Sequence, residues 1–569
     1  MTDKLTISLA QLNPTVGRID ANLAKLREAR RRAAEDGADL VLTSELYTCG
    51  YPPEDLVLKP LFIDDLRRQV EAFARETDDG GPAVLLGAPW RDEGGGLHNA
   101  LLLIDGGKIE AARYKHDLPN YGVFDEKRVF EPGPLPGPIN FRGVRIGVPI
   151  CEDIWTPDVV ECISETGGEI LLVPNGSPFE AAKTDQRLNH VMARVVESGL
   201  PLIYLNQIGG QDELVFDGGS FVVNADHSIA HQLPAWAETV VTTHWTRNAD
   251  GGWICSPGEI AEIETGLASI YQAMRVGLGD YVDKNGFPGV ILGLSGGIDS
   301  ALSAAVAVDA LGADRVHCVM MPSPYTSQES LDDAAGCAQM LGVRLDTVNI
   351  GPAMGAFDEM LSDMMAGTNA DTTEENVQSR ARGMTLMALS NKFGSMVLST
   401  GNKSEMSVGY ATLYGDMCGG YNALKDAYKV VVFDLSRWRN QHKPAGGLGP
   451  EGLVMPDRII TKPPSAELKP DQTDQDSLPP YDVLDAILNE LIENETPVDR
   501  IVQMGYDHDL VMRIWRMLDR AEYKRRQAAP GVKLGLKAFG RDRRYPITNA
   551  FLGAYQEPRQ DSGKTDAAE

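Results

Sequence analysis

The stretch that most constrains the fold runs from Gly289 to Ser300 and reads GVILGLSGGIDS. An apolar run, a Ser-Gly-Gly turn and an Ala- and Leu-rich continuation over residues 301–311 predict a strand, a tight loop and a helix. Glycines let the backbone approach an anion with bare N–H groups, and a helix N-terminus adds partial positive charge. The stretch therefore predicts a site for nucleotide phosphates, in which Asp299 suits a metal ion and Ser300 adds a hydroxyl donor.

The loop sequence also admits other interpretations. It lacks the Lys of a P-loop and the Gly-x-Gly-x-x-Gly of a dinucleotide fold. Its letters do fit the Gly-x-Ser-x-Gly elbow of a serine hydrolase, and a plain turn joining strand to helix is the blandest alternative. An elbow needs an acid and then a histidine at later strand ends, whereas His317, His442 and His508 fall in a predicted strand, a basic loop and a helix start. The nucleotide interpretation is therefore favoured.

The residues after the loop alternate between strand and helix. The expected order is strand 315–322, helix 330–341, strand 344–350, helix 373–393 and strand 395–399. This alternation predicts a parallel, doubly wound sheet, in which ligands bind beyond the carboxyl ends of the strands. The stretch from Thr400 to Glu405 follows the last of these strands, so it is expected to lie beside the Ser295–Ser300 loop.

Three polar residues follow predicted strands in the first half: Glu45, Lys115 and Cys151. A cysteine attacks as its thiolate, a nearby ammonium lowers the thiol pKa and holds an oxyanion, and a carboxylate moves the proton. Together they predict acyl transfer from an amide through a thioester. Each residue alone has a structural reading, since a buried cysteine is usually an apolar filler.

Residues 1 to about 250 resemble the nitrilase (carbon–nitrogen hydrolase) superfamily. The matching motifs are Ser44-Glu45-Leu46, the stretch RYKHDLP over residues 113–119, and VPICED over residues 148–153. The resemblance implies an α-β-β-α sandwich with Glu45 as base, Lys115 as oxyanion partner and Cys151 as nucleophile. The stretch LPNYGVFDEKR over residues 118–128 resembles the glutaminase domains of NAD synthetases, which implies glutamine binding by Tyr121, Ser177 and Lys183. Glu126 is either a second, orienting carboxylate or a structural residue.

Residues 263 to about 555 resemble the NAD synthetases of the N-type ATP pyrophosphatase group, which implies a Rossmann-like parallel sheet. Motifs at residues 295–300, 374–380, 399–405, 462–468 and 522–527 carry the resemblance. It implies deamido-NAD binding by Asn376, Glu405 and Lys524, and Mg²⁺ binding by Asp299 and Glu405, whose oxygens suit that ion. The implied ATP-binding residues are Gly293, Leu294, Ser295, Gly296, Gly297, Ile298, Asp299, Ser300 and Thr400.

The expected domain division places a glutaminase at residues 1–250, a linker at 251–262, a synthetase at 263–555 and a disordered tail at 556–569. An amphipathic helix over 260–283 is expected to pack on the second sheet or on another subunit. Residues 462–476 are rich in Pro, Asp and Gln, which is consistent with a mobile lid over the nucleotides or with a plain surface loop.

Charge and cysteine content restrict the partners. The 569 residues include 53 Lys and Arg against 81 Asp and Glu, a formal net charge of −28, which argues against nucleic acid or an anionic membrane surface as a partner. The seven cysteines form no Cys-x-x-Cys pair, so neither a zinc cluster nor a disulfide framework is expected. Without a signal segment or a long apolar run, a cytoplasmic homo-oligomer is expected.

The two resemblances together imply one reaction. Glutamine hydrolysed at Cys151 supplies ammonia, a buried channel carries it, and ATP adenylates deamido-NAD⁺, so that amidation gives NAD⁺, AMP and pyrophosphate. The alternatives are a nitrilase-type amidase fused to a nucleotide sensor, and another amidotransferase of the ATP pyrophosphatase group. The latter group carries different glutaminases, so the Glu45, Lys115 and Cys151 set argues against it.

Overall fold

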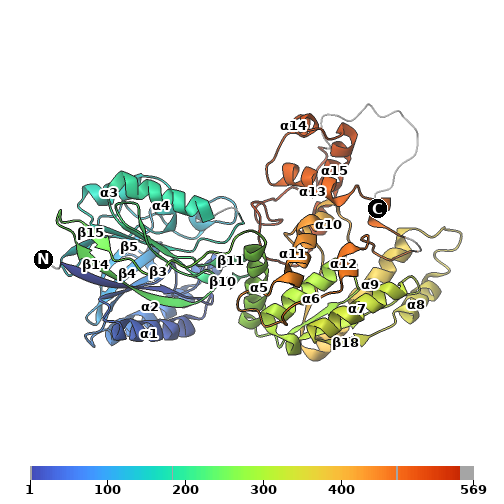
Figure 1. Ribbon diagram of the computed structural model, residues 1–569, viewed down its shortest axis with the longest axis horizontal. Coiled ribbons are helices and arrows are strands. Elements are labelled where there is room, and N and C mark those ends of the chain that lie inside the picture. The colour runs from blue at the N-terminus through green and yellow to red at the C-terminus, as the bar shows by residue number, and fades with distance from the viewer. Residues whose placement is uncertain (1–2, 182–183, 470–471, 552–569) are drawn as a thin grey trace.

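The computed structural model describes residues 3–181, 184–469 and 472–551, which form two α/β domains lying side by side (Figure 1). The N-terminal domain, blue to green, ends in β15, and the C-terminal domain follows from α5 onward. Among the described residues, no helix has the length and apolarity needed to cross a membrane.

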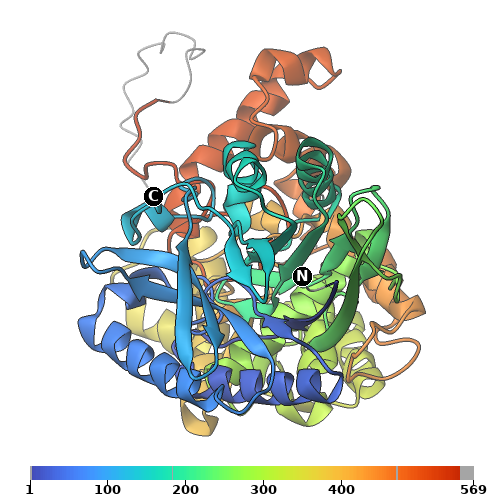
Figure 2. The ribbon, with the colours of Figure 1, turned by 90° about the vertical axis from the view of Figure 1, so that its left-hand side faces the viewer.

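The N-terminal domain is a sandwich of two sheets between two pairs of helices (Figure 2). The first sheet has the order β15 (Trp253–Cys255), β14 (Thr239–Arg247), β1 (Lys4–Gln11), β2 (Leu40–Leu42), β3 (Ala83–Arg91), β4 (Leu97–Asp105) and β5 (Lys108–Tyr114). The second has the order β13 (Ile229–Gln232), β12 (Phe221–Val223), β9 (Leu202–Asn206), β8 (Ile170–Asn175), β7 (Val144–Gly147) and β6 (Ile139–Phe141). The expected α-β-β-α architecture is confirmed.

Three apolar layers hold this sandwich together. Alternate side chains of β3 face opposite ways: Val84 and Leu86 join the layer under α1 (Ile19–Glu35) and α2 (Pro60–Glu76), and Leu85 joins the layer between the sheets. A third layer lies under α3 (Asp158–Glu165) and α4 (Thr184–Ser198). Because both faces of the central strands are buried, their carboxyl ends are the places where polar residues can gather.

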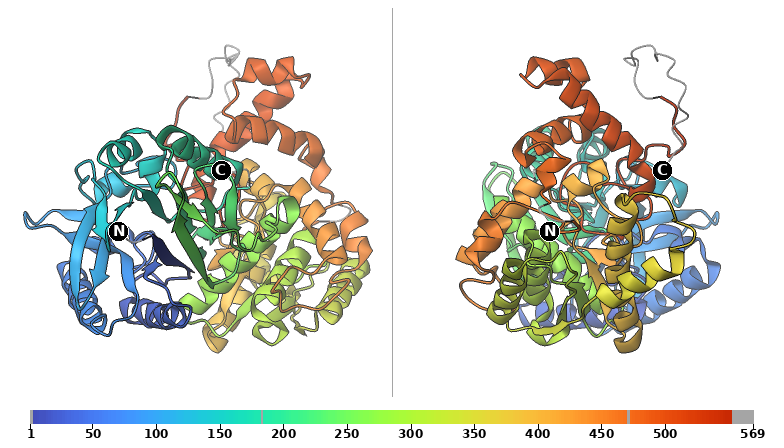
Figure 3. Two further views of the ribbon diagram at one scale, coloured as in Figure 1. Left: turned by 60° about the vertical axis from the view of Figure 1, so that its left-hand side comes forward. Right: turned by 90° about the vertical axis from the view of Figure 1, so that its right-hand side faces the viewer.

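The C-terminal domain contains a five-stranded parallel sheet (Figure 3). Its order is β18 (Arg344–Thr347), β17 (Val316–Met320), β16 (Val290–Gly293), β19 (Met396–Ser399) and β20 (Tyr421–Asn422). The core on one face includes α5 (Gly266–Lys284), α6 (Ile298–Leu311), α7 (Gln328–Leu341), α11 (Lys429–Gln441) and α12 (Asp457–Thr461). The other face is covered by α9 (Thr372–Phe393), which packs against α8 (Gly351–Leu361). The predicted doubly wound sheet is confirmed.

A separate helical core stands beside this sheet. It is built from α10 (Lys403–Val408), α13 (Tyr481–Ile492), α14 (Val498–Gln503) and α15 (His508–Arg520), and α16 (Glu522–Arg525) follows α15. In the right-hand view of Figure 3, orange helices from this part of the chain project at the top of the molecule. Because α10 begins just after β19, this helical core adjoins the carboxyl ends of the strands.

The helix predicted from Ile260 in fact begins at Gly266. Residues before it pair with the edge of the sandwich instead, because Gln232 N–H donates to Glu259 O at 3.0 Å and Ala261 N–H donates to Gln232 O at 2.9 Å. From Gly266 onward, α5 packs on α6 and on the hairpin of β10 (Ile208–Gln211) and β11 (Leu214–Asp217). The helix therefore joins the two domains of one chain.

The structure describes the predicted linker but not the predicted tail. Within the predicted linker 251–262, Trp253–Cys255 form the edge strand β15, paired with β14. The predicted disordered tail, residues 556–569, lies outside the described residues. The division into domains at these residues stays a prediction.

Candidate active sites

The first site brings Glu45 and Lys115 together at the carboxyl ends of strands. The ammonium of Lys115, which follows β5, lies 2.7 Å from Oε1 of Glu45, which follows β2. Both side chains are fully buried. Glu45 also accepts hydrogen bonds from Nδ2 of Asn99 at 2.8 Å and from the Gly176 N–H at 2.8 Å. These donors hold the Glu45 carboxyl group in place where a general base would be needed.

Cys151 lies at the same site on a tight turn. It follows β7 and begins the 3₁₀ helix η3 (Cys151–Ile154) with φ 47°, a left-handed conformation that non-glycine residues rarely adopt. Burial and the negative charge of Glu45 raise the pKa of the Cys151 thiol well above its usual value, and Lys115 opposes that rise. A neutral thiol next to a buried carboxylate requires a base to remove its proton during attack.

A second carboxylate, Glu126, completes the charge cluster. Its oxygens lie 2.9 and 3.0 Å from Nζ of Lys115, and it accepts from the Tyr51 hydroxyl at 2.9 Å. Burial alone would lower the pKa of the Lys115 ammonium, but Glu126 and Glu45 outweigh it and hold that pKa well above its ordinary value. Lys115 therefore stays charged, as an oxyanion partner must. Of the two alternatives for Glu126, the contacts favour an orienting role.

Gly87 shows how the backbone makes room for Glu45. A Cβ atom at Gly87 in β3 would lie 2.3 Å from the Ser44 carbonyl oxygen and 2.7 Å from the Leu46 nitrogen. Position 87 must therefore lack a side chain, because the segment that carries Glu45 crosses β3 there.

Asp153 ties the nucleophile turn to the end of β5. Its Oδ1 accepts from the N–H groups of His116 at 3.0 Å and Asp117 at 2.8 Å, and its Oδ2 accepts from the Ile150 N–H at 2.9 Å. These bonds link the residue before Cys151 to the residue after Lys115. Burial raises the pKa of Asp153 to about 7, although these N–H donors favour its charged form.

Asp153→Asn is expected to destabilise the protein by about 1–3 kcal/mol at pH 5, because one carboxylate oxygen becomes an N–H₂ group facing an N–H donor. The folded-state pKa of about 7 lies above the ordinary value of 3.8, so the contribution of Asp153 to stability falls as pH rises between them. Asparagine does not titrate, and the destabilisation relative to wild type should therefore shrink between pH 5 and pH 8. Urea unfolding at both pH values measures this. The exposed Asp64→Asn on α2 is the control, and a destabilisation that grows with pH would contradict the account.

Two of the three predicted glutamine-binding residues lie at this site. The Tyr121 side chain is 50% exposed, and its hydroxyl donates to Glu152, the neighbour of Cys151, at 2.9 Å. Ser177 is buried next to Gly176, and its hydroxyl accepts from Nε of Arg187 at 3.1 Å. Lys183, the third, lies outside the described residues.

The second site is the loop between β16 and α6. Gly296 has φ 80°, and a Cβ atom there would lie 2.2 Å from the Ser330 carbonyl oxygen, so only glycine fits. The Ser300 hydroxyl lies 3.1 Å from the Ser295 hydroxyl and donates to the Gly297 carbonyl at 2.9 Å. Ser295 is thus engaged within the loop. The ring of His317 lies instead on β17, 2.8 Å from Asp346 Oδ2, which removes support for the hydrolase elbow.

Asp299 and Glu405 face each other across one ammonium. Nζ of Lys429, the first residue of α11, lies 2.5 Å from Asp299 and 3.0 Å from Glu405. Asn402 at the start of α10 also donates to Asp299, at 2.8 Å. Burial raises the pKa of Glu405 to about 7, with a further contribution from Asp299 and with Lys429 opposing. The juxtaposition expected for the two strand ends is therefore present.

A cavity of about 320 Å³ opens over this cluster. Its lining includes every residue of the loop from Gly293 to Ser300 except Gly296, together with Thr400, Glu405 and Lys429. Residues 462–468 and Asp474 form another wall of the cavity. The ammonium of Lys462 lies 2.9 Å from Oδ2 of Asp333 on α7. Residues 462–468 thus lie where the predicted lid would be, although its mobility stays a prediction.

Two predicted dinucleotide-binding residues lie behind one wall of the cavity. Asn376 on α9 accepts from the Thr412 hydroxyl at 3.0 Å, and Lys524 on α16 donates to the carbonyls of Gly409 and Ala411, both at 2.7 Å. Both therefore hold the chain that follows α10, residues 409–412, in the observed arrangement. Their contact with a ligand stays a prediction.

The side chains around Lys429 fit a magnesium ion that retains water or phosphate oxygens. Within the described ranges, no group of three His, Cys, Asp or Glu residues is arranged to hold a metal ion. Asp299 and Glu405 nevertheless present hard oxygen atoms toward one point, which the Lys429 ammonium occupies, and Mg²⁺ usually takes only one or two carboxylates beside phosphates and water.

Sequence reasoning missed several residues of these sites. Asn99, Asp153 and Lys429 each contact a predicted site residue or the chain next to one, yet none was assigned a role. Asn99 lies 54 residues from Glu45, and Lys429 lies 130 residues from Asp299 and 24 residues from Glu405. Only Asp153 had a sequence signal, since it stands two residues after Cys151 at a strand end.

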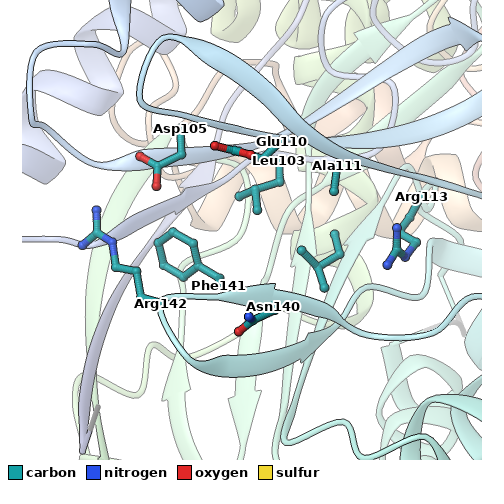
Figure 4. A pocket seen from close by; sticks show the side chains of 9 residues that line it. Leu103, Asp105, Glu110, Ala111, Arg113, Asn140, Phe141 and Arg142 are labelled. Carbon is teal, nitrogen blue, oxygen red and sulfur yellow. The ribbon is translucent and has the colours of Figure 1, made fainter. Parts of the chain in front are cut away.

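Another hollow of about 320 Å³ lies at the edge of the sandwich (Figure 4). It is lined by residues of β4, β5 and β6 and by Arg142, where the edges of the two sheets meet. None of the predicted site residues lines it, so it is separate from both sites.

Comparison with known proteins covers nearly the whole chain. The carbon–nitrogen hydrolase family model matches residues 6–253, and the NAD synthase family model matches residues 270–528. The chain is 52% identical to the glutamine-dependent NAD(+) synthetase of Rhodobacter capsulatus over 97% of its length and 99% of the relative. It is 44% identical to that of Acinetobacter baylyi, covering 96% of this chain and 98% of the relative. The solved structure of glutamine-dependent NAD⁺ synthetase from Acinetobacter baumannii with ADP has a TM-score of 0.76 and 43% identity, and the match covers 96% and 99% of the two chains.

Proposed function

The chain belongs to the glutamine-dependent NAD(+) synthetases, and we propose that its two domains divide the reaction between a glutaminase site and an ATP-dependent amidation site. The observation that carries this proposal is that one chain holds both clusters: Glu45 and Lys115 beside Cys151, and Asp299 with Glu405 under the second cavity.

In the glutaminase site, the sulfur of Cys151 attacks the side-chain carbonyl of glutamine while Glu45 takes the thiol proton. Lys115 stabilises the negative oxygen of the tetrahedral intermediate. Glu45 then gives its proton to the leaving nitrogen, so that ammonia departs and a thioester remains. Water, deprotonated by Glu45, hydrolyses the thioester to glutamate and restores the thiol. Tyr121, Ser177 and Lys183 are proposed to hold the glutamine.

In the synthetase site, the nicotinate carboxylate of deamido-NAD⁺ attacks the α-phosphorus of ATP, and pyrophosphate leaves. Ammonia then adds to the activated carbonyl, AMP leaves, and the carboxamide of NAD⁺ remains. The N–H groups of the Gly293–Ser300 loop and the N-terminus of α6 are proposed to bind phosphate oxygens, with Thr400 as a further ATP contact. Asp299 and Glu405 would hold Mg²⁺, which supplies charge neutralisation for the phosphates when bound. Asn376, Glu405 and Lys524 would contact the dinucleotide.

Lys429 is proposed to keep the acidic cluster neutralised before the nucleotide binds. Its side chain is 2% exposed, and its ammonium lies between Asp299 and Glu405, with the Tyr481 ring centroid 5.2 Å away. Without it, two partly buried carboxylates would face each other, which is energetically unfavourable.

The direct test compares nitrogen sources. Purified protein with deamido-NAD⁺, ATP and Mg²⁺ should form NAD⁺ and AMP with either glutamine or ammonium, measured by chromatography of the nucleotides. A protein that hydrolyses glutamine but forms no NAD⁺ with either source would instead support the alternative of an amidase fused to a nucleotide sensor.

The proposed location of the protein is the cytoplasm.

We also propose that two copies associate through the synthetase domain. Large apolar side chains on and near α8 and α9 are exposed, among them Met360 at 67%, Met364 at 84% and Met384 at 72%. A second copy of the chain is the simplest occupant, because homo-oligomers usually pair the same surface of both subunits.

The double substitution Met364→Glu with Met384→Glu is expected to shift the chain to a smaller species, because buried carboxylates in an interface are costly. Light scattering after size exclusion measures the mass. Leu61→Glu on α2 is the matched control, since Leu61 is 82% exposed on the other domain. An unchanged mass in the double variant would rule out this surface.

A further inference from the structure

A segment without regular structure, residues 530–539, contacts both domains and is called the bridging segment below. On the glutaminase side, the Lys533 N–H donates to the Glu213 carbonyl at 2.8 Å, and the Leu534 carbonyl accepts from the Ala181 N–H at 3.0 Å. Ala181 stands four residues after Ser177, which lies at the glutaminase site. On the synthetase side, the Pro530 carbonyl accepts from the Asn422 N–H at 2.9 Å.

Asp426 fixes the middle of the bridging segment to the synthetase domain. Its Oδ2 accepts from the Leu534 N–H at 2.7 Å and from the Gly535 N–H at 2.8 Å. The carboxylate is buried, and its other oxygen lies 2.6 Å from the ammonium of Lys403. The Leu534 carbonyl, which accepts from the glutaminase loop, thus lies between two N–H groups that donate to Asp426.

Lys403 connects this carboxylate to the ATP site. It is the first residue of α10 and is fully buried, and its ammonium also contacts Glu493 and the Lys537 carbonyl, the latter at 3.0 Å. The residue before it, Asn402, donates to Asp299, and Glu405 lies two residues further along the same helix turn. A displacement of this turn on nucleotide binding must therefore also displace Lys403.

We propose that Lys403 is a positioning residue: through its ion pair with Asp426 it sets the bridging segment according to the occupancy of the ATP site, and thereby the glutaminase loop of residues 177–181. This inference rests on the proposed function and names residues through which the synthetase site regulates the glutaminase site.

The physical basis is the burial of the ion pair. A buried charge is strongly disfavoured without its partner, so Lys403 and Asp426 have to move as a unit. The buried N–H of Leu534 likewise has to keep an acceptor. Energetic coupling between distant sites is carried by such packed and hydrogen-bonded elements, and it is reciprocal.

The test compares Asp426→Asn with wild type. The amide keeps an oxygen for the N–H groups of Leu534 and Gly535 but loses the charge opposite Lys403. NAD⁺ formation from ammonium should stay within about threefold of wild type, while stimulation of glutamine hydrolysis by deamido-NAD⁺, ATP and Mg²⁺ should fall about fivefold or more, the lower end of usual coupling factors. Glu495→Gln is the matched control, because the Glu495 side chain is 66% exposed and pairs with the partly exposed Lys537 in the same region.

Hydrogen exchange supplies a readout that a purely structural role would not move. In wild type, binding of ATP and deamido-NAD⁺ should change the exchange rates of the Leu534, Gly535 and Ala181 amides together. In Asp426→Asn the change at Ala181 should disappear while the synthetase site still binds nucleotide. An unchanged stimulation ratio in Asp426→Asn would overturn the inference, as would wild-type exchange at Ala181 that ignores nucleotide. The proposed function fails separately, if wild type forms no NAD⁺ from glutamine.

Discussion

Cys151→Ala is expected to lower NAD⁺ formation from glutamine by at least about 10³-fold, because Cys151 supplies the sulfur of the proposed thioester. Formation from ammonium should stay within about twofold of wild type, since the second cavity is lined without any residue of the first site. The measurement is initial-rate NAD⁺ production with each nitrogen source at saturating deamido-NAD⁺ and ATP.

The matched control for this variant is Cys162→Ala, a partly buried cysteine on α3 of the same domain. It should retain both activities. If ammonium fails to restore synthesis in Cys151→Ala while the protein remains folded by circular dichroism, the proposed separation of the two sites is wrong.

Asp299→Ala is expected to reduce synthesis by at least about 10²-fold with both nitrogen sources, a loss comparable to removing one electrostatic stabiliser of a transition state. The substitution takes away an oxygen that faces Lys429 and Asn402 and removes a proposed ligand for Mg²⁺. Glutamine hydrolysis measured without nucleotides should remain within about twofold, because Cys151 and its partners are untouched.

Asp314→Ala is the control for this variant, because Asp314 is an exposed aspartate just after α6. Synthesis from either nitrogen source at near wild-type rate in Asp299→Ala would refute the proposed role of Asp299 at the phosphates. If only NAD⁺ formation from glutamine were lost, Asp299 would instead have a role in communication between the two sites.

Much of the fold is predictable from the sequence because burial on both faces leaves long apolar strands that alternate with amphipathic helices. The strand before Gly293 and the helix from Ile298 lie where the pattern placed them. Helix α5 begins at Gly266 rather than at Ile260 because residues 259–261 pair with Gln232, a contact that periodicity within a segment does not reveal. Local pattern locates elements, whereas pairing between distant segments decides where some of them begin.

The residues of the two sites likewise differ in whether the local sequence reveals them. Glu45 and Lys115 stand at strand ends and were predicted, and the structure brings them to 2.7 Å. Asn99 is 54 residues from Glu45, and Lys429 is 130 residues from Asp299 and 24 from Glu405, and neither stands in a local motif. Polar residues that hold the predicted site residues are therefore visible only in the folded chain.

In the proposed reaction, ammonia released at Cys151 reaches the synthetase site of the protein without mixing with solvent. The most direct test of this transfer supplies glutamine labelled with ¹⁵N at the side-chain amide together with an equal concentration of unlabelled ammonium, and measures ¹⁵N in the NAD⁺ carboxamide by mass spectrometry. The account predicts that most of the product carries ¹⁵N in early turnover. A label diluted to the isotopic proportion of the ammonia in solution would contradict it.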